Sequence, residues 1–363
     1  MKKITLVFCL LLTLITNGQQ RRECGTKPRS PLVHHDMLRP LTTRPQYAAP
    51  YPVRIFIHVF ADNAGANRAT ADTSILRQVQ NMANFYAPHD ICFIVAGIDQ
   101  INNTALWSMN ADTEEADLLQ YLVPGCIDIF VHEVLFDSDG SLNGIAYDIP
   151  NHYLSIVASA AEATDNISTL AHEMGHCFGL IHTFQDRVVN NVTIRERVNR
   201  TGACSNCNTE GDLVCDTEAD WDVAETSISS TTCQYIGNTL NDDCNNPYVM
   251  TPTNIMTYGR RSCRNNFTNG QGTRARAFLL ATNFLEECIA ENSLTLSTNQ
   301  TISSGIHIYA ARNQVTVNAG QLVINGSAAA NFSAKQVVLS PGTRFAPTGT
   351  AAYVSARAGT VCQ

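Results

Sequence analysis

The chain has 363 residues, enough for one or two domains with hydrophobic cores of their own. Its formal net charge is −8 at pH 7 and no basic stripe is visible, which argues against nucleic acid as a partner. Thirteen cysteines are present, and their interpretation depends on whether the chain is exported.

Residues 1–18 have the features of a secretory signal peptide. Lys2 and Lys3 form a basic start, and residues 4–15 are almost wholly apolar. This run is too short to span a bilayer, and no later stretch is long enough. We therefore expect a secreted protein (extracellular, cell-surface or periplasmic) without a transmembrane segment. Removal of Cys9 leaves twelve of the thirteen cysteines, and all of them could pair.

Residues 19–50 are polar and rich in proline, which is typical of a linker, a pro-segment or an extended arm. They contain Cys24 in the stretch RRECGTKP, before any hydrophobic pattern begins. Because Arg21, Arg22 and Glu23 precede this cysteine, a lipid-attachment site is excluded. A disulfide and a role in chemistry elsewhere stay open.

From residue 51 onwards the pattern predicts an α/β or α+β domain. Val53, Ile55, Ile57 and Val59 alternate as in a strand. A helix, three apolar strands and a second helix follow, over residues 72–86, 90–98, 126–135, 152–159 and 168–179. The chemistry is expected on the last helix.

Residues 190–275 are rich in Asn, Asp, Thr, Gly and Cys, with little periodicity. A loop-rich subdomain with a small core needs covalent support, and six cysteines are available: Cys204, Cys207, Cys215, Cys233, Cys244 and Cys263. The C-x-x-C spacing of the first two lacks a βαβ context or a second pair, which favours disulfide loops over a redox or zinc-ribbon role. A helix over residues 272–292 closes this part. Residues 293–363 then alternate short β runs with Gly, Asn and Ser, which is typical of a small solenoid or sandwich.

The strongest chemical signal is HEMGHCFGLIH, from His172 to His182. His172 and His176 are four residues apart on the predicted helix, so both imidazoles leave one face. Gly179 permits a sharp break of the chain, which brings His182 round as a third ligand. Three histidines leave the fourth position of a tetrahedral Zn²⁺ open for water, which is the catalytic arrangement; a structural zinc is the alternative.

Glu173 follows the first of these histidines and need not bind the metal itself. It is placed to act as general base on the zinc-bound water, whose pKa zinc lowers to about 7. Cys177 lies within the motif but shares the opposite helix face with Leu170, Met174 and Phe178. We therefore predict that Cys177 is a buried apolar residue and not a ligand.

The residues from His172 to His182 resemble the metzincin zinc signature. Metzincins also have a methionine in a tight turn near the metal, and TNIMTYG (253–259) is similar, with Met256 as the candidate. The resemblance implies that Tyr258 steadies the oxyanion during hydrolysis. It also implies a twisted mixed sheet, an active-site helix and a loop-rich C-terminal subdomain.

Within the metzincins, the chain resembles the pappalysin family over roughly residues 50–290. The similar segments include HTFQ after the third histidine, GDLVCDTEAD and SCRNNFTNGQGTRARAF. NGIAYDIPNHYLSIV is similar to the family's cleft rim, and the resemblance implies that a protein or peptide substrate pairs with YLSIV as the edge strand. The predicted organisation is a signal peptide (1–18), a pro-segment (19–50), a peptidase domain (51–292) and a β-repeat domain (293–363).

The pappalysin resemblance has two further implications. It implies a disulfide between Cys233 and Cys263, with Cys244 joined to Cys204 or Cys207, although an additional cysteine in CSNCNTEGDLVC departs from the family pattern. The family also binds structural calcium near the segment that matches GDLVCDT. The hard oxygen ligands available there belong to Asp212, Asp216 and Thr217, for which plain solvation is the alternative.

Cys24 can be interpreted against the zinc site, because a thiolate is an excellent zinc ligand. In some metzincin pro-segments an Arg-flanked Cys-Gly occupies the open zinc position and excludes water, and RRECGT resembles that arrangement. We therefore predict a zymogen with a cysteine switch in which Cys24 binds zinc. A disulfide from Cys24 to another cysteine is the alternative.

The sequence thus predicts a secreted zinc endopeptidase. A second hypothesis is an adhesin or binding protein that uses the β-repeat domain, but the intact Glu173 favours the enzyme. A gluzincin is a third hypothesis, and it leaves His182 and Met256 unexplained. The physiological substrate, the preferred cleavage residue and the oligomeric state stay open.

Overall fold

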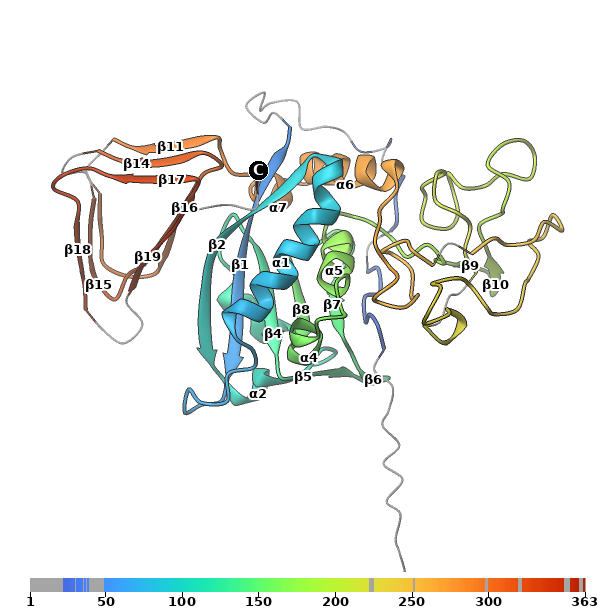
Figure 1. Ribbon diagram of the computed structural model, residues 1–363, viewed down its shortest axis with the longest axis horizontal. Coiled ribbons are helices and arrows are strands. Elements are labelled where there is room, and N and C mark those ends of the chain that lie inside the picture. Colours follow the sequence, from blue (N-terminus) through green and yellow to red (C-terminus); the bar gives the residue numbers. More distant parts are fainter. Residues whose placement is uncertain are drawn as a thin grey trace, which may run out of the picture.

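The computed structural model (Figure 1) describes residues 22–29, 31–34, 36, 38, 49–221, 225–250, 252–297, 300–318, 322–348, 353–358 and 362. The predicted signal peptide and parts of the predicted pro-segment lie outside these residues. The described chain comprises a mixed sheet with helices, a loop-rich region with disulfides, and a set of short parallel strands.

A five-stranded sheet in the order β2-β1-β4-β8-β7 is the framework of the first region. Its strands are β1 (Tyr51–Ala61), β2 (Ile91–Asn102), β4 (Ile127–His132), β7 (Gly144–Ala146) and β8 (Tyr153–Val157). Neighbouring strands are parallel except for β7, which runs antiparallel to β8. The mixed α/β fold expected from the sequence is confirmed.

Two helices, α1 (Asp72–Tyr86) and α5 (Thr169–Cys177), pack on one face of this sheet (Figure 1). The alternating residues Val53, Ile55, Ile57 and Val59 of β1 are all buried in the core between the sheet and these helices. Burial of each such side chain stabilises the fold by about 1.5–3 kcal/mol. The Tyr86 hydroxyl also donates to the carbonyl of Ala171 at 3.0 Å, which fixes α1 against α5.

The edge of the sheet is not where the sequence places it. The YLSIV stretch forms β8, an inner strand between β4 and β7 whose residues are all buried. Because both of its sides are already paired, β8 has no free backbone groups for a peptide. The edge strand is β7, which the sequence reasoning missed because only three residues form it.

The stretch 126–135, predicted as one strand, is divided between two sheets. Strand β4 ends at His132, whose buried ring bonds the Leu106 carbonyl at 2.6 Å. The chain then enters β5 (Val134–Asp137), which pairs with β3 (Ser108–Asn110) and β6 (Gly140–Ser141). Short helical turns connect these strands: η2 (Ala87–His89), α2 (Thr104–Trp107), α3 (Glu115–Leu118), η3 (Leu119–Tyr121) and α4 (Ala158–Glu162).

The predicted helix over residues 272–292 is two helices, α6 (Asn269–Ala281) and α7 (Asn283–Glu286). Thr268 and Gln271 form a capping box that starts α6 earlier than predicted. Thr282 has extended backbone angles (φ −109°, ψ 116°), which end α6.

The loop-rich region has little regular structure in its described residues: β9 (Arg187–Val189), β10 (Val192–Ile194) and η4 (Glu225–Ser227). Its disulfides are Cys204–Cys244, Cys207–Cys215 and Cys233–Cys263. The last is the pair that the resemblance implies, and Cys244 joins Cys204 rather than Cys207.

Complete pairing of the cysteines, which the even count allowed, is wrong. A fourth disulfide joins Cys92 to Cys362, but four of the cysteines that the structure describes are free and buried, namely Cys24, Cys126, Cys177 and Cys288. Cys177 lies in the apolar core beside α5, as its helix position predicts.

The C-terminal strands form a β-solenoid and not a sandwich. Three parallel sheets, β11-β14-β17, β12-β15-β18 and β13-β16-β19, enclose an apolar core (Figure 1). The strands are β11 (Ser293–Leu296), β12 (Gln300–Ile302), β13 (Ile306–Ala310), β14 (Gln314–Val317), β15 (Leu322–Gly326), β16 (Ala329–Ala334), β17 (Gln336–Leu339), β18 (Arg344–Pro347) and β19 (Tyr353–Ala358). The Cys92–Cys362 bond ties this unit to β2, at the sheet edge opposite β7.

Candidate active site

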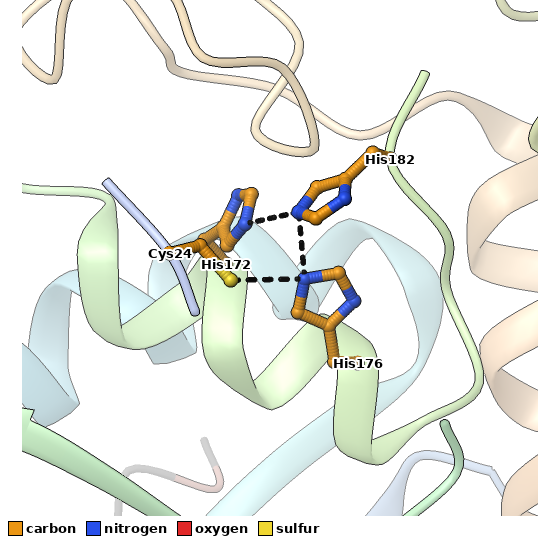
Figure 2. A group of neighbouring side chains, drawn as sticks. All are labelled: Cys24, His172, His176 and His182. Carbon is orange, nitrogen blue, oxygen red and sulfur yellow. Dashed lines mark hydrogen bonds between the residues drawn. The ribbon is translucent and has the colours of Figure 1, made fainter. Parts of the chain in front are cut away.

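Helix α5 and the turn after it bring three histidines to one point. His172 and His176 leave one face of the buried helix, one turn apart. Gly179 adopts a left-handed φ of +78°, which lets the chain turn sharply. The turn places Nε2 of His182 3.2 Å from Nε2 of His172 and 3.1 Å from Nε2 of His176 (Figure 2).

Backbone carbonyls hold both helix histidines in the same tautomer. Nδ1 of His172 donates to the Ile255 carbonyl at 2.7 Å, and Nδ1 of His176 donates to the Leu180 carbonyl at 2.9 Å. Their Nε2 atoms therefore present lone pairs to His182. Burial, together with the neighbouring histidines, lowers the pKa of His172 well below its ordinary value, which favours the neutral ring that binds metals. This donor set fits a divalent cation with nitrogen ligands, such as Zn²⁺.

The segment 253–259 packs against α5 beside the histidines. Met256 is buried, and a Cβ atom added to Gly175 would lie 2.6 Å from its sulfur, so the methionine touches the helix backbone. The Tyr258 ring lies 4.9 Å from the His182 ring, centroid to centroid. The structure thus brings Met256 and Tyr258 to the place near the histidines that the resemblance implies.

Glu173 lies between the histidines and the N-terminal segment. Its Oε2 accepts hydrogen bonds from the Cys24 thiol at 3.3 Å and from the Thr26 hydroxyl at 3.1 Å. Its Oε1 has no partner among the described residues. Burial raises the pKa of Glu173 to about 8. A carboxyl group that exchanges a proton near neutral pH is suited to general acid–base chemistry.

Residues 22–29 lie along the strands β6 and β7. The Arg22 amide donates to the Ser141 carbonyl at 2.9 Å, and the Gly25 amide donates to the Gly144 carbonyl at 3.0 Å. The segment runs parallel to this edge, as the Arg22–Leu142 bridge shows. Its charged side chains add ion pairs: Arg22 with the buried Asp137, and, nearer the surface, Lys27 with Asp139 and Arg29 with Glu115.

Cys24 faces the three histidines from this segment. Its sulfur lies 3.5 Å from Nε2 of His176, and one ligand atom of each of the four residues lies within 4.8 Å of the others (Figure 2). The Tyr258 hydroxyl donates to the Cys24 carbonyl at 3.2 Å. Burial, and then the charge of Glu173, raise the pKa of the Cys24 thiol. Cys24 is free, so the structure does not contain the disulfide weighed as its alternative.

Glu23, next to Cys24, is buried against basic residues of the loop-rich region. Its carboxylate accepts hydrogen bonds from Arg264 at 2.9 Å and from the Asn143 amide at 3.3 Å, and it lies 3.5 Å from Nε of Arg261. Sequence reasoning missed this contact because Arg264 lies 241 residues away. Only the position of Glu23 beside Cys24 could have drawn attention to it.

Of the three residues suggested for calcium, Asp212 and Thr217 come together, but Asp216 does not join them. The Thr217 hydroxyl donates to Asp212 at 3.0 Å, and Asp212 is buried. Asp216 points elsewhere, because it accepts hydrogen bonds from Thr268 and from the amide of Gly270, each at 2.7 Å. Its contacts at the start of α6 are those of a capping residue.

A second buried carboxylate, Glu196, lies near Asp212, and sequence reasoning missed it. Burial and the charge of Asp212 raise the pKa of Glu196, and burial raises the pKa of Asp212. Each of the two has one oxygen without a partner among the described residues.

The fold and the histidine cluster define a metallopeptidase, and comparison with known proteins gives the family. A family model described as pregnancy-associated plasma protein-A, peptidase M43, matches residues 138–280. An extracellular metalloprotease of Pyricularia oryzae is 30% identical over 234 residues, covering 60% of this chain and 71% of the relative. One of Podospora anserina is 28% identical over 254 residues, with 66% and 76% covered. The chain belongs to the pappalysin family of metallopeptidases.

Among solved structures, mature mirolysin of Tannerella forsythia in complex with a cleaved peptide is similar at 18% identity. The match covers 67% of this chain and 97% of that one, with a TM-score of 0.47. Membership of the pappalysin family implies a bound metal and protein or peptide substrates, so the adhesin and gluzincin hypotheses are not retained. No helix among the described residues is long and apolar enough to cross a membrane.

Proposed function

We propose that the chain is a secreted zinc endopeptidase made as a latent precursor. The observation that carries this proposal is the convergence of Cys24, His172, His176 and His182. The three histidines would hold Zn²⁺, which supplies a Lewis acid that activates water and polarises the scissile carbonyl. Secretion is supported by the relatives, which are named extracellular metalloproteases.

Glu173 is the proposed general base. It takes a proton from the attacking water and passes it to the leaving amine as the carbon–nitrogen bond breaks. Its place on α5, next to His172, suits both transfers. The Tyr258 hydroxyl, which bonds the Cys24 carbonyl in the latent form, would then donate to the oxygen of the substrate carbonyl.

The substrate would bind as an extended peptide along β7. In the latent form this edge is used by the N-terminal segment, whose backbone bonds the carbonyls of Ser141 and Gly144. A substrate peptide would take over these groups by β-augmentation, which requires no particular sequence. Recognition of side chains must then come from the pockets around the edge.

Latency follows from the same contacts. Cys24 would fill the fourth ligand position, and its thiol and the Thr26 hydroxyl both donate hydrogen bonds to Oε2 of Glu173. The segment would therefore block the metal, the general base and the substrate edge together. Proteolytic cleavage of the chain between this segment and the peptidase domain would allow residues 22–29 to leave the site.

A chelator experiment tests the activity. The full chain, once processed, is expected to digest casein, to lose this activity with 1,10-phenanthroline and to regain it with zinc. Glu173→Ala should lower kcat about 10²–10⁴-fold while zinc stays bound. Cleavage that survives both chelation and Glu173→Ala would contradict the proposed function.

Latency is tested with Cys24→Ala. We expect the unprocessed variant to be on the order of tenfold more active than the unmodified precursor, or to process itself faster, because the plugged state loses its ligand. Cys126→Ala, which removes an equally buried free thiol in a separate cluster, is the control. If both variants stay as latent as the precursor, Cys24 is not the switch.

Calcium binding near Asp212 is a separate proposal. It is supported by the unpartnered oxygens of Asp212 and Glu196 and by the adjacent Thr217 hydroxyl. Calcium should raise the Tm of the full chain, and Asp212→Asn should abolish the shift, whereas Asp216→Asn should keep it. A Tm that does not respond to calcium would exclude the site.

A further inference from the structure

The carboxylate of Glu23 occupies an enclosed basic site directly beside the proposed metal position. The side chain is 9% exposed, and the Arg264 side chain that it pairs with is 1% exposed. Arg261 lies at the rim with 31% exposed, and Asn143 contributes its side-chain amide. We call Asn143, Arg261 and Arg264 the arginine subsite.

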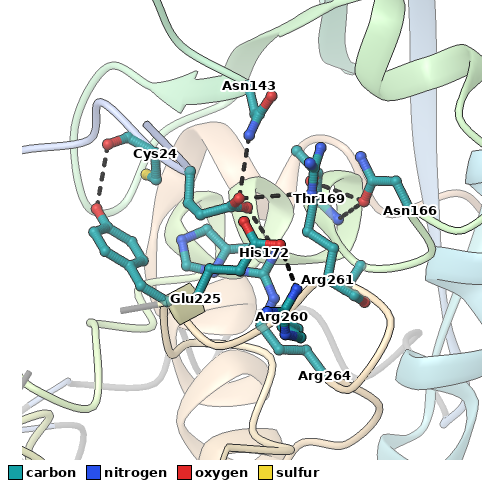
Figure 3. Close-up of polar contacts among 12 residues, drawn as sticks. Cys24, Asn143, Asn166, Thr169, His172, Glu225, Arg260, Arg261 and Arg264 are labelled. Atoms are coloured by element: carbon teal, nitrogen blue, oxygen red, sulfur yellow. Dashed lines mark hydrogen bonds and ion pairs between the residues drawn. The ribbon is translucent and has the colours of Figure 1, made fainter. Parts of the chain in front are cut away.

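The subsite belongs to the cleft and not to the N-terminal segment. Asn143 lies between β6 and β7, and both arginines lie in the loop that follows Tyr258 (Figure 3). Glu23 immediately precedes Cys24, and the backbone on both sides of the pair is bonded to the β6–β7 edge. The subsite therefore receives the side chain next to the residue that faces the metal. In a bound substrate, the corresponding position would flank the scissile bond.

Without this carboxylate the two guanidinium groups of the subsite have no ion-pair partner among the described residues, and the negative charge that still acts on Arg264 is that of Glu173 on α5. Among the described residues, Glu23 is the only carboxylate that forms an ion pair with Arg264 or Arg261. The neighbouring Arg260 differs, because it pairs with Glu225 of its own region and bonds the Ile228 carbonyl at 2.7 Å. Departure of the N-terminal segment removes this ion-pair partner from Arg264, and a carboxylate from the next occupant would restore the charge-assisted hydrogen bond.

We propose that the arginine subsite selects substrates with an acidic side chain, Glu above Asp, next to the scissile bond. This inference rests on the proposed peptidase function and adds the substrate class. Glutamate matches the length of Glu23, and aspartate is one methylene shorter. Glutamine keeps the shape but loses the charge, whereas lysine places a second cation against Arg264.

A purely latent role for the same contact makes a different prediction. If Arg264 serves only to hold Glu23 in the precursor, the processed enzyme has no preference for acidic residues. The two roles are therefore separated by the cleavage preference of the enzyme after its N-terminal segment has left.

The first experiment uses the full chain after self-processing, with an unbiased peptide library read by mass spectrometry. We expect Glu enriched at a position flanking the cleaved bond, on either its N-terminal or its C-terminal side. Matched peptides with Glu, Gln or Lys at that position should show kcat/KM at least about tenfold higher for Glu than for Gln. Lys should be the poorest of the three.

The second experiment changes the subsite. Arg261→Gln, at the exposed rim, should reduce the preference for Glu over Gln, and Arg264→Met should abolish it. Arg260→Gln, with its separate partner Glu225, is the matched control and should keep the full preference. Because Arg264 is buried, zinc content and circular dichroism of the Arg264→Met variant must first match those of the unmodified enzyme. Arg264→Lys retains the positive charge and serves as a second variant, which should keep part of the preference for Glu over Gln.

A binding measurement checks the subsite without turnover. The peptide RRECGTKP should inhibit the processed enzyme more strongly than the same peptide with glutamine for glutamate, by at least about tenfold in Ki. Equal inhibition together with cleavage indifferent to Glu, Gln and Lys would overturn the inference while leaving the peptidase function intact. Absence of any zinc-dependent cleavage would instead overturn the proposed function.

Discussion

The two halves of the site are held by different forces. His172, Glu173 and His176 stand on α5, which packs with α1 and the central sheet in an extensive apolar core. Tyr258 and Arg264 stand in the loop-rich half, whose own described apolar cluster is small and in which three disulfides link the chain, although Ile255, Met256 and Phe267 of this half reach into the core of α5. Packing thus fixes the first half, and covalent links fix much of the second.

This difference corresponds to a division of chemical tasks. Proton transfer and metal binding need fixed geometry, which a close-packed core supplies. Contacts to side chains of the substrate or of the N-terminal segment come from loops, which tolerate sequence change on a stable scaffold. Substitutions of the metal ligands and Glu173 in the packed half should therefore abolish hydrolysis, whereas substitutions of Arg261 and Arg264 in the loops should change its selectivity.

Gly179 lies where the two halves meet, and we expect hydrolysis to be most sensitive to substitution at this position. Its φ is +78°, and an added Cβ would lie 2.4 Å from the Phe278 ring. Left-handed strain of about 1–2 kcal/mol and overpacking of about 1–3 kcal/mol should displace the turn that carries His182. Gly179→Ala should lower zinc content after dialysis and reduce hydrolysis at least about a hundredfold.

Gly202 provides the control for this substitution. It has a similar φ of +81°, but nothing lies within 4 Å of an added Cβ. Gly202→Ala should cost only the backbone strain and leave zinc content and hydrolysis unchanged. If the two variants behave alike, the turn at Gly179 does not position the third histidine.

The packed half was largely predictable from sequence because its signals are local. The alternation from Val53 to Val59 and the i, i+4 spacing of His172 and His176 depend only on strand and helix periods. The three histidines of the metal-binding cluster come from one stretch of chain, His172 to His182. Its prediction needed no knowledge of which strands are neighbours.

The remaining features of the site, namely the Glu23–Arg264 contact and the position of the sheet edge, could not be predicted, because they depend on pairing between residues far apart in the sequence. Glu23 and Arg264 meet across 241 residues, and β7 is an edge only because of the order of the strands around it. Asp216 carried the right oxygen atoms for calcium, but the start of α6 uses them. Composition reveals which groups are available, but not which partners reach them.

Removal of the Cys233–Cys263 disulfide tests the covalent half. Cys263 precedes Arg264 and follows Tyr258 closely in sequence, so the link supports both. A double Cys→Ala variant should lose about 2–4 kcal/mol of stability. Hydrolysis should fall about tenfold and selectivity for Glu should weaken, because the subsite is less ordered. Hydrogen exchange should rise over residues 252–268 and stay low in α5.

The Cys207–Cys215 bond is the corresponding control, because it closes a short loop elsewhere in the same region. Its double Cys→Ala variant should keep hydrolysis within about twofold. Equal losses in both variants would mean that the disulfides stabilise the region as a whole and do not order the subsite in particular.

The smallest effect on hydrolysis is expected from the Cys92–Cys362 bond. It ties the β-solenoid to β2, and β2 lies at the opposite edge of the sheet from β7. Apolar contacts among Cys92, Ile94, Ala290 and Ala310 also hold the solenoid there. A double Cys→Ala variant should therefore hydrolyse short peptides within about twofold of the unmodified enzyme, while hydrogen exchange in the solenoid rises because its end is no longer tethered. A large loss of hydrolysis would show that the solenoid supports the cleft through the sheet, as a third determinant beside the packed core and the disulfides.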